Sequence, residues 1–203
     1  MRWSMAIGAL VAAVAVTPAG LRGIQLDLAR ADIEAALKAA RGSEVQRAQF
    51  HAAYRVPVTD AFVETLEIIT EYRRVVLLAE QRIAAGEWAF GLSSRWAEEA
   101  LRPWKGKVSV RSRIRFHPQN VYPALPRIDI TIGTGADLQS PLRTGSTPMY
   151  APGIYAAGAA PLIGAEAEAD FDAARAAQRV LDVIVRIQGG SDVHRAVDFG
   201  SLK

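Results

Sequence analysis

The sequence predicts an α+β protein, in which a helix-rich N-terminal half packs on an antiparallel β-sheet or small β-sandwich in the C-terminal half. Apolar residues before about residue 104 recur mainly at helical spacing. From Lys107 onward they alternate with polar residues at every second position, which indicates strands. Helices and strands that are segregated along a chain in this way are typical of the α+β class.

The first helices are indicated by their capping residues. The pattern predicts a short strand over 24–28 and then an Ala-rich helix over 32–41, with Gly42 placed to end it in the left-handed conformation. Ser43 and Gln46 have the spacing of a capping box, so a second short helix should follow.

The next segment has two interpretations. Its apolar spacing fits one long helix, but its β-branched cluster favours a strand over 62–69 followed by a helix over 71–85. We favour the second interpretation, because Thr70 is a good N-cap and Gly86 a good terminator. A further short helix is expected over 95–101.

The strand-rich half begins with the clearest alternation in the chain. Four apolar side chains should face the core from a strand over 107–117, namely Val108, Val110, Ile114 and Phe116. Residues 133–163, rich in Gly, Pro, Ala and Thr, are expected to form a long loop. Further strands are expected at 128–132, 165–171, 181–187 and 193–199, the last two joined as a hairpin.

The opposite face of the 107–117 strand is a candidate binding surface. It carries Arg111, Arg113, Arg115 and His117, and guanidinium groups bind phosphate, sulfate or carboxylate groups in a bidentate manner. The alternative, which we favour, is that the arginines pair across neighbouring strands with acidic residues of the same period, namely Glu166, Glu168 and Asp170.

A second candidate surface is aromatic. Trp88, Trp96 and Trp104, together with Phe90, lie between the helix-rich and strand-rich parts of the sequence. They could line a ligand groove, but large aromatic side chains bury much area, and a role in the core is the favoured interpretation.

The sequence offers no local catalytic or metal-binding motif. The three histidines, His51, His117 and His194, lack metal-ligand spacing, and no serine lies in a Gly-x-Ser-x-Gly motif. Residues 133–138 resemble a dinucleotide-binding turn but lack its third glycine. The absence of cysteine excludes disulfides, thiolate ligands and cysteine nucleophiles. We therefore expect no catalytic residue, metal or cofactor.

The N-terminus has the pattern of a secretory signal peptide over residues 1–19: Arg2, an apolar run from Met5 to Val16, and small residues after it. About twelve residues are too few to cross the ~30 Å hydrocarbon core as a helix. The mature chain would then be a single α+β domain over 20–203, helix-rich over 24–104 and strand-rich over 105–203. An uncleaved N-terminal anchor is the alternative.

These observations predict an exported protein, periplasmic or extracellular, without a stable membrane span after processing. The net charge of +3 is too small for a polybasic protein, and no aromatic residue is interleaved among the arginines, so nucleic acid is not expected as a partner. We expect a non-enzymatic binding or assembly module of the cell envelope, with an envelope protein or an anionic polymer as partner. The alternative function is a secreted or periplasmic hydrolase whose site is assembled from distant residues.

The leader generates the first testable prediction. Mass spectrometry of the protein isolated from its native host should find a mature N-terminus near Gly20 or Leu21, because small residues precede that position. A cytoplasmic product that retains Met1 would contradict export.

Overall fold

The computed structural model describes residues 23–60, 62–87, 92–119, 122–153, 160–177, 179–190 and 192–203. The expected leader, Trp88 and Phe90 lie outside these ranges. Within them, no helix is both long and apolar enough to cross a membrane.

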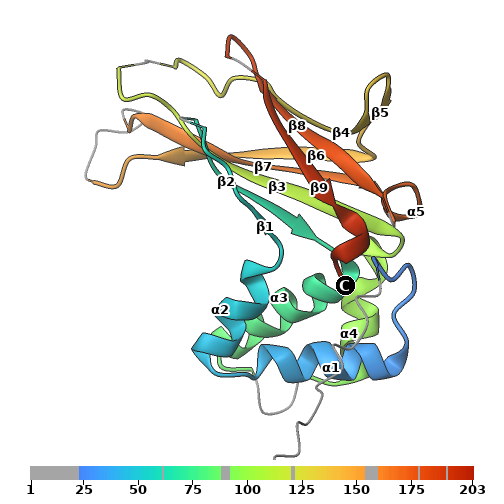
Figure 1. The fold of residues 1–203 in the computed structure, drawn as a ribbon. Helices are drawn as coiled ribbons and strands as arrows, with labels where there is room; N and C mark the ends of the chain where they lie inside the picture. Colours follow the sequence, from blue (N-terminus) through green and yellow to red (C-terminus); the bar gives the residue numbers. More distant parts are fainter. Residues whose placement is uncertain are drawn as a thin grey trace, which may run out of the picture.

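Two antiparallel sheets form the upper part of the molecule as drawn in Figure 1. The strands of the five-stranded sheet lie in the order β1 (Arg55–Val56), β2 (Val63–Ile69), β3 (Lys107–Arg115), β7 (Leu162–Asp172) and β6 (Arg143–Tyr150). The strands of the four-stranded sheet lie in the order β5 (Asp137–Gln139), β4 (Ile128–Thr134), β8 (Val180–Ile187) and β9 (Val193–Asp198).

One apolar core joins the two sheets. It combines inward side chains of β2, β3 and β7 with those of β4, β8 and β9. The expected inward face is confirmed, since Val108, Val110 and Ile114 of β3 and Phe116 directly after it are all buried. The charged residues of β3 therefore lie on the outer face of the five-stranded sheet.

Four helices lie together below the sheets and enclose a second apolar cluster. They are α1 (Arg30–Ala40), α2 (Glu44–Ala52), α3 (Glu71–Ala84) and α4 (Ser94–Leu101). The single-turn helix α5 (Ala173–Ala176) and two 3₁₀ turns, η1 (Arg102–Trp104) and η2 (Phe199–Ser201), complete the described elements. The capping box of α2 is confirmed, and so is the choice of a strand followed by a helix over 62–85.

The α+β class is confirmed, but the expected division of the chain needs a correction. The N-terminal half is not simply helical, because β1 and β2 belong to it and both are strands of the five-stranded sheet. The five-stranded sheet therefore contains strands from both halves of the chain, and β2 pairs directly with β3 along most of its length.

The expected long loop over 133–163 is also wrong in part. It contains β5 and β6, and β6 pairs with β7 along eight positions from Arg143 to Tyr150. The strand escapes pattern analysis because it lies at the sheet edge with most of its side chains exposed. An edge position also explains how the strand tolerates Pro148.

Two smaller expectations fail. Residues 24–28 form no strand, although Ile24 is buried in the sandwich core. Gly42 does not adopt the left-handed conformation, and Arg41 caps α1 in a right-handed one. At Gly42 a Cβ atom would lie 3.0 Å from the carbonyl oxygen of Ala39, so glycine is favoured there by space.

The N-terminus of α3 holds a buried acid. Thr70 caps the helix by accepting the N–H of Arg73, and Glu71 follows it with 1% of its surface exposed. One carboxylate oxygen of Glu71 accepts the N–H of Gly106 at 2.5 Å, and the other has no hydrogen-bond partner among the described residues. Burial raises the pKa of Glu71, and nearby Asp27 raises it further, against the opposite effects of Gly106 and Lys105.

The raised pKa of Glu71 predicts that the stability of the protein depends on pH. Because the folded-state pKa of Glu71 lies above its unfolded value, its contribution is fully present at low pH and is lost as pH rises through the folded pKa. The free energy of unfolding of the wild type should therefore fall, relative to Glu71→Gln, as pH rises above the ordinary glutamate pKa of 4.5. Denaturant titrations of both proteins measure this difference. A difference that stays constant or grows with pH would contradict the assignment.

Candidate functional site

Charges of alternating sign cross the outer face of the five-stranded sheet. Arg55, Glu67, Arg111 and Glu168 lie in one row, because each is in register with the next on the neighbouring strand. The Nε and Nη2 atoms of Arg111 lie 2.9 and 2.7 Å from one carboxylate oxygen of Glu168. The expected proximity of the arginine and acidic faces is thus correct, and the pair that forms is Arg111 with Glu168.

Two arginines of helix α3 contact the acidic residues of this row. Arg73 and Arg74 are both buried, and their Nη2 atoms lie 2.7 Å from Glu67 and 2.9 Å from Glu168. Although burial opposes ionisation, Arg73 and Arg55 hold the pKa of Glu67 below its ordinary value, and Arg74 and Arg111 do the same for Glu168. We call these five residues, Glu67, Arg73, Arg74, Arg111 and Glu168, the ionic seam.

Asp170 extends the same polar layer at the α3 end of the sheet. Its buried carboxylate accepts hydrogen bonds from Ser109 at 2.7 Å and from Arg143 at 2.8 Å. Trp104 lies against the guanidinium groups of Arg74 and Arg143, whose central carbons are 3.9 and 4.6 Å from its ring. This end of the outer face is therefore filled by internal contacts.

The far end of the arginine row is different. The side chains of Arg113 and Arg115 remain 47% and 69% exposed, and both contact the single carboxylate of Glu64 rather than Glu166. Exposed His117 follows, and its Nδ1 accepts the backbone N–H of Gln119, so in the neutral ring the proton lies on the free Nε2. These three side chains retain donors that no described residue takes up.

These side chains border a groove of about 920 Å³. The groove lies where the end of β3 meets the ends of β6 and β7 and the segment after Pro118. Its polar rim consists of Glu64, Arg113, Arg115 and His117. Its lining is otherwise mainly apolar and includes Phe116, Tyr122, Leu125, Met149, Tyr150 and Leu162.

Two local features shape this groove. Glu64 lies at an irregularity in the β2–β3 pairing, where the register shifts between Val63 and Thr65, and such a bulge redirects a side chain. Gly164 lies between Arg115 on β3 and Met149 on β6, in register with both. A Cβ atom at Gly164 would collide with the carbonyl oxygen of Ile114, so only glycine lets the strands approach closely there.

Sequence patterns missed several groove residues. Glu64 belongs to a bulge, which depends on the register between two strands and has no signature in one of them. Met149 and Tyr150 lie in the segment that the composition indicated as loop. Phe116 and Tyr122 lie with ring centroids 4.5 Å apart, a contact that could have been suspected from their closeness in sequence.

Two of the aromatic candidates, Trp96 and Trp104, lie among the described residues. Trp96 and Trp104 are half-buried and pack against the helical cluster. Arg82 lies 4.8 Å from the centre of the Trp96 ring, while Trp104 contacts the other arginines described above. Both side chains take part in internal packing, and Trp88 lies outside the described residues.

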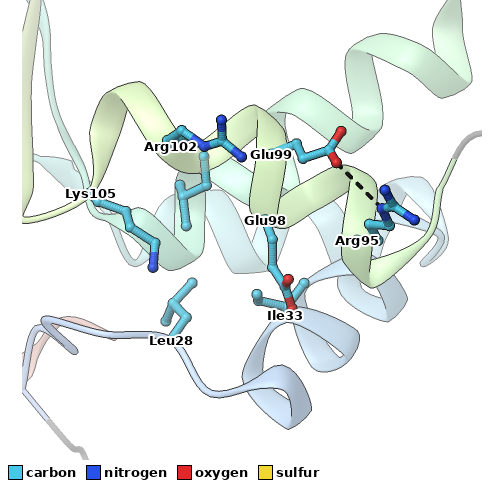
Figure 2. A pocket seen from close by; sticks show the side chains of 8 residues that line it. Leu28, Ile33, Arg95, Glu98, Glu99, Arg102 and Lys105 are labelled. Carbon is cyan, nitrogen blue, oxygen red and sulfur yellow. Dashed lines mark hydrogen bonds and ion pairs between the residues drawn. The ribbon is translucent and has the colours of Figure 1, made fainter.

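A second hollow, of about 680 Å³, lies between the segment preceding α1 and the α4–η1 region. Figure 2 shows that its side chains carry both signs of charge and that Arg95 and Glu99 form an ion pair along α4. In the same view Lys105 lies on the side of Leu28 and Glu98 on the side of Ile33.

One histidine contacts a carboxylate. His51 Nε2 lies 2.9 Å from Glu80, and Arg73 donates to its Nδ1 at 3.4 Å. No described hydroxyl group hydrogen-bonds to this pair, which connects α2 with α3. In the described part of the chain, no group of three or more His, Asp or Glu residues is arranged to hold a metal ion.

The two ends of the arginine row should differ in stability. Arg74→Met should lower the free energy of unfolding by about 2–3 kcal/mol, because it leaves a half-buried carboxylate with one guanidinium group fewer. The matched variant Arg113→Met should cost less than about 1 kcal/mol, because its ion pair is exposed and Arg115 still contacts Glu64. Equal losses in denaturant titrations would contradict this division of the arginines.

Comparison of the chain with protein-family models, with curated proteins and with solved structures gives no match in any of the three. The groove is therefore identified as the candidate site by its own chemistry: two exposed guanidinium groups and an imidazole beside an apolar hollow.

Proposed function

We propose that the protein is an exported, non-enzymatic binding module of the cell envelope, and that the groove binds a ligand carrying negative charge. The leader pattern of residues 1–19 supports export. The groove supports binding, because three donor side chains converge at one side of a concave, mainly apolar surface.

One observation carries the proposal: Arg113 and Arg115 share one carboxylate and remain exposed, while Arg111 is committed to Glu168. Each guanidinium group has five N–H donors in a planar fork, so contact with Glu64 leaves further donors free. Among the residues that line the groove, two positive charges stand against the one negative charge of Glu64, and Glu166, opposite Arg113 on β7, is not part of the lining. The lining therefore attracts anions.

A fluorescent anion tests the proposal. Anilinonaphthalene sulfonate, which carries a sulfonate on an aromatic body, should bind the folded protein with an affinity that falls as ionic strength rises. The double variant Arg113→Glu, Arg115→Glu should weaken binding by at least about tenfold, since each change replaces attraction by repulsion.

The matched control is Arg30→Glu. Arg30 is 78% exposed on α1 and carries the same charge far along the chain from the groove, so its reversal should leave the affinity unchanged. If the rim and control variants bind the dye equally well, or if salt has no effect, the groove is not an anion site.

A further inference from the structure

We infer that the ligand of the groove is a single-chain amphiphile with one compact anionic headgroup, such as a carboxylate or a phosphate monoester. The inference rests on the proposed function and narrows it. In this arrangement the headgroup contacts Arg113, Arg115 and His117, and the apolar chain lies along the groove floor.

The charge pattern favours one compact anion over an anionic polymer. An extended polyanion would need a row of cations of one sign, but Glu166 and Glu168 lie directly opposite Arg113 and Arg111 across the β3–β7 pairing. Arg111 is also occupied by its contact with Glu168. The cationic surface available to a ligand is therefore confined to the end of β3.

The remainder of the groove favours an apolar chain. Beyond the rim, its lining combines aromatic and aliphatic side chains, among them Phe116, Tyr122, Leu125, Met149 and Leu162. Tyr150 and Ile163, which also line it, are 57% and 38% exposed. A bound alkyl chain would cover these two side chains and remove their apolar surface from water.

The strand register sets the two halves of the site at a suitable separation. Arg115, Gly164 and Met149 lie on three adjacent strands in register, so the cationic and apolar sides are roughly 10 Å apart across the sheet. Gly164 adds no side chain between them. A ligand can therefore contact both sides without crossing a ridge.

The shape of the site favours a monomeric amphiphile over a membrane surface. The apolar side chains line a hollow, and Tyr122, Leu125, Met149 and Leu162 in its lining are only partly exposed. Insertion into a bilayer would instead require apolar side chains that project from the protein. We therefore assign the groove to a single molecule that enters it.

Competition with the fluorescent anion tests the inference on the unmodified protein. Octyl, decyl and dodecyl phosphate, each below its micelle-forming concentration, should displace the dye with affinities that rise about three- to fourfold per added methylene group. Inorganic phosphate and dodecanol should each displace it at least about a hundredfold less effectively than dodecyl phosphate, because each lacks one half of the ligand.

Other outcomes overturn the inference in distinguishable ways. If heparin or inorganic phosphate competes as well as dodecyl phosphate, the groove is a plain anion site and the proposed function survives. If dodecanol competes as well as dodecyl phosphate, the ligand needs no anionic headgroup.

If the protein binds vesicles of anionic phospholipid and the monomeric alkyl phosphates do not compete, the groove binds a membrane surface and not a single amphiphile. If no alkyl phosphate displaces a dye that binds in a rim-dependent manner, the amphiphile is excluded.

A pair of variants tests where the alkyl chain of the ligand lies. Met149→Glu places a negative charge on the half-buried apolar side of the groove and should weaken binding of dodecyl phosphate by at least about tenfold. Val180→Glu, at a strand end with 59% exposure and outside the groove, is the matched control and should have no effect. Thermal unfolding checks that both variants are folded. Equal affinities of the two variants for dodecyl phosphate would overturn the placement of the alkyl chain.

Discussion

The contact between the arginines of α3 and the outer face of the five-stranded sheet is the constraint on which the rest of the structure depends. Arg73 and Arg74 are buried at the helix–sheet junction, where an unpaired guanidinium group would be costly. Glu67 and Glu168 meet this need from two different strands. The ionic seam therefore fixes α3 against β2, β3 and β7 and orients the helical layer on the sheet.

The same constraint divides the arginine row of β3 into two parts. Arg111 lies close enough to α3 to share Glu168 with Arg74, and its side chain is less exposed, at 37%, than those of Arg113 and Arg115. Arg113 and Arg115 lie further along the strand, beyond the helix, where one bulge residue, Glu64, is shared between them. A strand that appears uniform in sequence thus serves packing at one end and offers its remaining donors at the other.

The sequence allowed prediction of those features that depend on one element at a time. The alternation of β3 placed Val108 and Phe116 in the core, and the equal period of the basic and acidic faces indicated that the two faces lie on neighbouring strands. Which arginine contacts Glu168 depends on the register between those strands, and the structure pairs it with Arg111 rather than Arg113. Features that depend on register between elements could not be predicted: the bulge at Glu64, and the edge strand that brings Met149 to the groove. Arg73 and Arg74 lie in a helix whose spacing gives no sign that basic residues are buried.

The pKa of Glu168 is the most direct test of the ionic seam. Side-chain NMR titration of the folded protein should find the pKa of Glu168 below the ordinary glutamate value of 4.5, because Arg74 and Arg111 both stabilise its ionised form. In the Arg74→Met protein the pKa should move upward. A Glu168 pKa at or above the ordinary value in the wild type would show that the carboxylate is not held by the two arginines, and would contradict the division of the arginine row.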